Sequence, residues 1–113
     1  MHADAQKLLW DTQAATGRVI EFTSGKTFAE YDADVYFRSA GKRQPGIAGE
    51  ALAQVRRIDP QTAGTIADLP RVVGFRNVLI HGYANVDNRL VWGVIENHVA
   101  GLHNALTALL HAK

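Results

Sequence analysis

The residues from 76 to 83, Arg-Asn-Val-Leu-Ile-His-Gly-Tyr, carry the side chains in this sequence that are best suited to chemistry. Arg76 is a permanent cation that can donate two parallel hydrogen bonds to a phosphate. His81 carries an imidazole, which is the side chain best suited to accept and release a proton under physiological conditions. A fixed positive charge beside a proton-transfer group is the minimum equipment for cleaving a phosphodiester. We therefore take Arg76 and His81 as the candidate catalytic pair.

The spacing within this motif predicts which side chains share a helix face. Asn77 and His81 lie four residues apart, so Asn77 could hydrogen-bond the imidazole and orient it as a supporting residue. Arg76 and Tyr83 lie nearly on one face, whereas Arg76 and His81 diverge by roughly 140° on an ideal helix. They can meet on one phosphate if the helix loosens near Gly82, if the arginine stem bends, or if a second copy of the chain supplies the missing group.

RNA is the phosphodiester that needs the fewest groups from a protein, because its 2′-hydroxyl is a built-in nucleophile. A base, an acid and a cation for the crowded phosphorane suffice, so no metal is required in principle. One histidine cannot hold and lack a proton at the same time. Two copies of His81 in a homodimer can divide these roles, which is a physical reason to expect a dimer.

An ordinary structural role for the same residues is the main alternative. Arg76 could pair with an acidic residue such as Glu50 or Asp34, and His81 could hydrogen-bond a carbonyl. Tyr83 could be an amphipathic residue at a helix end. The spacing of the motif does not by itself distinguish this interpretation from a catalytic one.

Length and composition restrict the possibilities further. The chain has 113 residues, 47% of them hydrophobic and 20% charged, which fits a single globular domain spanning residues 1–113. Its formal net charge of +1 gives no global attraction to nucleic acid, so RNA affinity must come from a local patch or from two chains together. No cysteine is present, which excludes disulfides and thiolate chemistry. With neither a secretory signal nor a membrane span in the sequence, we expect a cytoplasmic protein.

Other polar residues give weaker signals. Five cations could line an RNA path or be scattered surface charges: Lys42, Arg43, Arg56, Arg57 and Arg71. His98 and His103 are five residues apart, which does not place two metal ligands on one side of a helix. The acidic residues from 30 to 34 are typical of a cap or a solvated face. We therefore expect neither a metal site nor a cofactor.

Apolar periodicity predicts an all-α fold. A first helix is expected over about 3–22, with a buried stripe at spacings of three and four. Thr27 and Glu30 have the form of a capping box, and a long second helix is expected from about 32 to 57. Gly41, Pro45 and Gly46 predict a kink or a short break within it.

Prolines and capping residues predict the later elements. The dipeptide Asp59-Pro60 should end the second helix, because the residue before a proline avoids the helical region. A short helical turn is expected over 62–68. Pro70 is suited to the first turn of the next helix, which should fray at Gly82. Asp87 or Asn85 should cap a final helix running to about residue 111, with its apolar residues, Leu90 among them, facing inward. The expected architecture is a compact bundle of four to five helices.

The segments around the motif together resemble the HepT family, which consists of helical toxins of the HEPN superfamily. The resemblance lies in Gly49-Glu50-Ala51, Leu69-Pro70, the 76–83 motif and Val91-Trp92. It implies a helical bundle that dimerises and holds the motif in a cleft between subunits. It also implies a metal-independent ribonuclease, with Arg76 and His81 as the catalytic pair and Asn77 as a polar supporter.

The resemblance also implies a regulatory partner. Members of this family form toxin–antitoxin pairs with a nucleotidyltransferase of the minimal (MNT) type, which is expected to transfer AMP from ATP onto Tyr83. Added phosphate and adenine would fill the cleft and neutralise its charge. Two other functions stay open: a non-catalytic helical partner and AMP acceptor of a nucleotidyltransferase, and a structural dimer in which Arg76, His81 and Tyr83 form a buried network.

Overall fold

The computed structural model describes residues 1–82 and 85–111, and it contains no strand in these ranges. The predicted all-α fold is therefore confirmed. The helices are α1 (Ala3–Thr23), α2 (Phe28–Ala33), α3 (Val35–Ile58), α4 (Pro60–Ala63), α5 (Leu69–Gly82), α6 (Asn88–Val94), the π-helical segment η2 (Ile95–Val99) and α7 (Ala100–Leu110).

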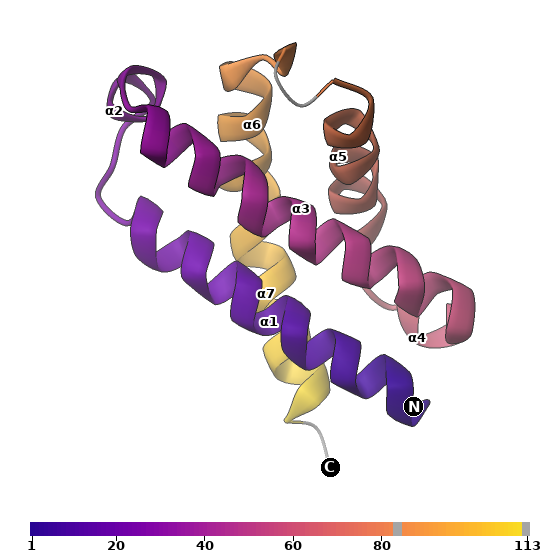
Figure 1. Ribbon diagram of the computed structural model, residues 1–113. Coiled ribbons are helices and arrows are strands. Elements are labelled where there is room, and N and C mark those ends of the chain that lie inside the picture. Colours follow the sequence, from indigo (N-terminus) through magenta and orange to yellow (C-terminus); the bar gives the residue numbers. More distant parts are fainter. Residues whose placement is uncertain (83–84, 112–113) are drawn as a thin grey trace.

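The two longest helices, α1 and α3, lie side by side and run in opposite directions (Figure 1). Behind them, α6, η2 and α7 follow one another as a single helical run that crosses both long helices (Figure 1). Helix α5 packs against α3, on the side of α3 away from α1 (Figure 1). No helix among the described residues is both long enough and apolar enough to cross a membrane.

Helix α1 buries the stripe that its periodicity predicts. The stripe contains five buried residues: Leu9, Thr12, Ala15, Thr16 and Val19. Ile20, at its C-terminal end, is exposed. The two buried threonines are satisfied within the protein, because the Thr12 hydroxyl donates to the Leu8 carbonyl and the Thr16 hydroxyl contacts His103 Nδ1 at 2.8 Å. Small polar residues thus let α7 approach α1 closely without leaving an unpaired buried group.

The predicted second helix is in fact two helices. The capping box is confirmed, since Thr27 and Glu30 satisfy each other's backbone amides at the start of α2. However, α2 ends at Ala33, and the Asp34 side chain then accepts hydrogen bonds from the amides of Tyr36 and Phe37, which starts α3. The expectation of one helix from about residue 32 was wrong because Asp34 is an N-cap rather than an interior residue.

Helix α3 continues through the segment where a kink or short break was predicted, and its helical residues run without interruption from 35 to 58. The glycine at 41 is a packing requirement, because a Cβ there would lie 2.5 Å from the Tyr31 ring. Pro45 is buried inside the helix. Contacts with neighbouring elements therefore hold together a helix that local propensity alone would interrupt.

An aromatic cluster joins the α2 end of the molecule to α6. Tyr31 lies 5.1 Å from Phe37 and 5.3 Å from Trp92 between ring centroids. Trp92 is buried and so packs in the core of the protein. Aromatic burial of this kind fixes the position of α6 relative to α3.

The connections follow the predicted proline signals closely. α3 ends before Pro60, but the short helix α4 covers Pro60–Ala63 rather than residues 62–68. Hydrogen bonds from the His2 amide and from Thr62 hold the pKa of Asp59 below its ordinary value of 3.8 at this junction.

Asp87 caps α6, as predicted. Leu90 was expected to face inward but is 46% exposed.

Candidate active site

Arg76 is fixed by the close packing of α5 on α3. Gly49 is buried, and a Cβ at this position would lie 2.5 Å from Arg76 Cβ and 2.7 Å from the Val72 carbonyl oxygen. Only glycine therefore lets the two helices approach this closely. The Arg76 side chain, which is 27% exposed, emerges beside Glu50 and forms an ion pair with it through Nη2.

The remaining donors of Arg76 determine what it can bind. Its Nη1 donates to the amide oxygen of Asn77 at 2.9 Å, and its Nε is buried without a hydrogen-bond partner in the described part of the chain. A guanidinium has five N–H groups, so each terminal nitrogen keeps a second donor beyond its contact with Glu50 or Asn77. These donors are suited to a phosphate oxygen.

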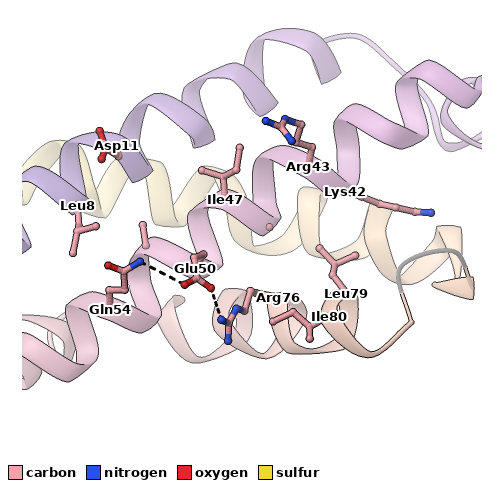
Figure 2. Close-up of a pocket in the computed structure, with 12 residues that line it drawn as sticks. Leu8, Asp11, Lys42, Arg43, Ile47, Glu50, Gln54, Arg76, Leu79 and Ile80 are labelled. Atoms are coloured by element: carbon pink, nitrogen blue, oxygen red, sulfur yellow. Dashed lines mark hydrogen bonds and ion pairs between the residues drawn. The ribbon is translucent and has the colours of Figure 1, made fainter.

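Arg76 lines an open groove of about 630 Å³ between α1, α3 and α5, which we call the central groove. Glu50 and Arg76 meet in the middle of it, with the side chain of Ile80 next to the arginine (Figure 2). Leu8 and Asp11 contribute the α1 wall. The groove is thus largely apolar, with an ion pair at its centre, and it is accessible from solvent.

His81 lies outside the central groove, on the exposed face of α5. Within the described residues it makes no hydrogen bond and no ion pair, so the ordinary role considered for it, a bond to a carbonyl, is not observed. Among the described residues of one copy, the central groove is lined by Arg76 but not by His81. This matches the divergence of roughly 140° expected for an unbroken helix.

The other two predicted site residues have different outcomes. The amide oxygen of Asn77 contacts Arg76 rather than His81, so in this structure Asn77 supports the guanidinium. Tyr83, the expected site of AMP modification, lies outside the described residues. The ordinary role considered for Arg76, an ion pair with Glu50, is observed, but it leaves Arg76 at the surface of a groove rather than in a closed network.

The structure separates the five cations considered for an RNA path. Lys42 and Arg43 line the central groove together with Arg76. Arg56 and Arg57 are exposed on the last turn of α3 and do not line it. Arg71, the fifth, lines a separate hollow of about 440 Å³ between α5 and α6. Spacing alone does not give this grouping, because Arg43 and Arg57 both lie seven residues from Glu50 and share its helix face, yet only Arg43 lines the groove.

The histidines of the final helical run have structural partners that the sequence did not reveal. His98 Nδ1 lies 3.0 Å from a carboxylate oxygen of Asp68, just before α5, and His103 contacts Thr16. Residues 1–82 and 85–111 contain no group of three or more His, Cys, Asp or Glu side chains arranged to hold a metal ion.

Comparison with known proteins decides the family. The profile of the family described as "Ribonuclease HepT-like" matches residues 12–109. The chain belongs to the HepT-like ribonuclease family. A protein of Methanocaldococcus jannaschii, described by its name as a candidate RNase, is 32% identical over 98 residues, which cover 85% of this chain and 87% of that protein. No solved structure matches the chain significantly.

Membership in the HepT-like family confirms the resemblance noted in the sequence and supports ribonuclease activity in general. The matched region extends from the middle of α1 almost to the end of α7. It contains the whole 76–83 motif and the lining of the central groove apart from Leu8 and Asp11. For a HepT-like ribonuclease, an arginine at a solvent-accessible groove and an exposed histidine on the same helix are the residues on which RNA chemistry can be built.

Proposed function

We propose that this protein is a metal-independent RNA endonuclease that uses Arg76 and His81 at a cleft between two copies of the chain. The observation that carries the proposal is the position of Arg76, whose guanidinium lies at an open groove with donors still available, in a chain of a ribonuclease family. His81 is exposed five residues further along α5 and is available to a substrate.

The proposed reaction is an intramolecular transesterification, in which the 2′-hydroxyl replaces the 5′-oxygen on the phosphorus. A neutral His81 accepts the proton of the 2′-hydroxyl, whose oxygen attacks the adjacent phosphorus. The bond from phosphorus to the 5′-oxygen breaks, and a protonated His81 from the second copy donates a proton to that oxygen. Arg76 stabilises the negative charge of the crowded phosphorane. The products are a 2′,3′-cyclic phosphate and a free 5′-hydroxyl, so atoms and protons balance.

Exposed apolar side chains of α5 and α6 support pairing of two copies. Val78 and Leu90 line the same hollow between these helices and are 43% and 46% exposed, and Ile80 of α5 is 61% exposed. Exposed apolar side chains of this size are typical of an interface. A two-fold axis near α5 would bring His81 of one copy toward the other and would overcome the divergence of Arg76 and His81 along one helix.

We further propose that the protein is the toxin of a toxin–antitoxin pair and that a nucleotidyltransferase antitoxin silences it. In this proposal the Tyr83 phenol oxygen attacks the α-phosphorus of ATP, pyrophosphate leaves, and AMP remains on the tyrosine. Tyr83 is two residues from His81 in the sequence, and its modification would add negative charge next to the proposed catalytic residue along the chain.

The nuclease proposal is tested with purified protein and a single-stranded RNA in the presence of EDTA. The wild type should produce fragments with 2′,3′-cyclic phosphate ends, and the His81→Ala variant should be slower by roughly 10²- to 10⁴-fold, the contribution of a proton-transfer group. Because His81 is exposed, its replacement should change the free energy of unfolding by less than about 0.5 kcal/mol. Equal rates for the two proteins, or cleavage that requires an added metal, would contradict the proposal.

The regulatory proposal has a separate test. The protein is co-expressed with a nucleotidyltransferase of the minimal type, and the peptide containing Tyr83 is examined by mass spectrometry. Mass additions in steps of one AMP are expected for the wild type and none for Tyr83→Phe. An unmodified peptide together with full inhibition by the partner would show that silencing works by binding alone. Modification without any nuclease activity in the unmodified protein would favour the non-catalytic AMP acceptor.

A further inference from the structure

The cations of the central groove lie at one of its ends, whereas the acidic residue at the other end, Asp11, is paired with Lys7 at 3.2 Å. Asp11 and Gln54 lie toward one end, and Lys42 and Arg43 lie toward the other, with the Glu50–Arg76 pair between them (Figure 2). Arg43 and Gln54 are separated by about 16 Å along the helix axis. A phosphate chain that touches Arg76 is therefore attracted toward the end that carries Lys42 and Arg43.

The basic end continues into a second hollow. Lys42 lines both the central groove and a hollow of about 620 Å³ that we call the loop hollow, which is bordered by the start of α3 and by residues 85–88. Its lining also includes one further cation, one hydroxyl and two carboxylates: Arg38, Ser39, Asp32 and Asp87. Arg38 and Lys42 are one helical turn apart, so the cations of α3 follow one another along a single face from the loop hollow to the central groove.

We infer that single-stranded RNA runs from Arg76 along this face of α3, with Lys42 and Arg43 holding the phosphates next to the scissile one. This inference rests on the proposed function. It specifies the substrate as single-stranded RNA and gives the path of the strand across the surface. Arg43 is exposed and has no hydrogen-bond or ion-pair partner in residues 1–82 and 85–111, so a phosphate would displace no partner.

The apolar rim of the groove favours a single strand over a duplex. Ile47 and Ile80 border it from α3 and α5, and both are exposed. The flat faces of the bases are stacked inside a duplex, whereas in a single strand they are available to apolar side chains. Phosphate contacts on one side and base contacts on the other are the arrangement that single-strand binding requires.

The test measures binding separately from cleavage. In the His81→Ala background, the affinity for a fluorescent single-stranded RNA is measured by anisotropy over a range of KCl concentrations. Arg43→Gln should weaken binding and reduce the slope of log K against log salt by about 0.7, the value for one lost single-strand phosphate contact. Lys42→Gln should also weaken binding and reduce this slope.

Arg57→Gln is the matched control, because it removes the same charge from an exposed position of the same helix outside the groove. Its slope should equal that of the parent. Equal slopes for Arg43→Gln and Arg57→Gln, or no measurable RNA binding by the parent, would overturn the inference. An unchanged slope with an altered mass in sedimentation would identify the groove as an interface between copies. Equal affinity for a duplex of the same length would overturn the preference for a single strand.

The failure of this inference can be told apart from that of the proposed function. A protein that cuts RNA but shows equal slopes for the two variants is a nuclease with a different RNA path. A protein that binds RNA along α3 but leaves it intact is a binding protein, and the proposed chemistry is then wrong.

Discussion

At the scale of single residues, the ion pair between Glu50 and Arg76 sets the charge of the central groove. The carboxylate neutralises the guanidinium in the free protein, and the Glu50 side chain is about half exposed. An incoming phosphate must therefore share Arg76 with a resident negative charge. The pair contributes little to stability, since solvent screens ion pairs of this exposure.

Replacing Glu50 with glutamine tests this view of the groove. Glu50→Gln keeps the size of the side chain and removes its charge. In the His81→Ala background, the Glu50→Gln variant should therefore bind single-stranded RNA more tightly than the parent. The free energy of unfolding should change by no more than about 1 kcal/mol. Binding is read by anisotropy and stability by urea denaturation. The control is Glu21→Gln, an equal charge change at an exposed position of α1 that does not line the groove. Weaker binding by the Glu50 variant would show that the carboxylate positions Arg76 for RNA.

At the scale of elements, the contact between α3 and α5 determines where Arg76 lies. Gly49 brings the backbones together, and a Cβ at Gly46 would lie 3.1 Å from the Leu79 side chain, so small residues recur on this face of α3. By contrast, a Cβ at Gly74, on α5, would have no heavy atom within 4 Å. Glycines in neighbouring helices thus have different roles, which their local sequence does not reveal.

Two alanine substitutions separate these roles. Gly49→Ala places a methyl group against the Val72 carbonyl and Arg76, so the helices must move apart, with a loss of about 1–3 kcal/mol in stability and a reduced cleavage rate. Gly74→Ala adds helix propensity in open space and should raise stability by up to about 1 kcal/mol. Thermal denaturation measures both effects. Destabilisation of equal size at both positions would show that α5 does not pack on α3 as described.

At the scale of the whole molecule, one copy presents Arg76 and His81 in different directions, and its net charge of +1 attracts RNA only weakly. Pairing two copies addresses both features, because it doubles the local cations and supplies a second histidine. The proposed division of acid and base between two His81 side chains makes the dimer the catalytic unit.

Mixed dimers test this division. Wild type and His81→Ala are refolded together in equal amounts, and cleavage is compared with that of the same total concentration of wild type. If each reaction needs both histidines, activity should fall to about a quarter, the fraction of dimers with two intact copies under random pairing. If each copy acts alone, about half should remain. A value near one half, with dimers confirmed by sedimentation, would leave the nuclease in place and remove the shared site.

The sequence alone was sufficient to predict the helical class and most helix ends and to name the catalytic candidates, because these depend on local properties. Capping at Thr27, proline at Pro60 and the periodicity of α1 act over one or two turns. The resemblance that the motif carried also identified the family that the comparisons confirmed.

Tertiary structure decided the rest, because contacts between distant residues outweigh local preference. Packing against Tyr31 keeps α3 helical through Gly41, and the approach of α5 selects Glu50 as the partner of Arg76. It also gathers Lys42 and Arg43, but not Arg57, around one groove. Spacing along a chain fixes which face of its own helix a residue occupies, but only the packing of helices determines what that face meets.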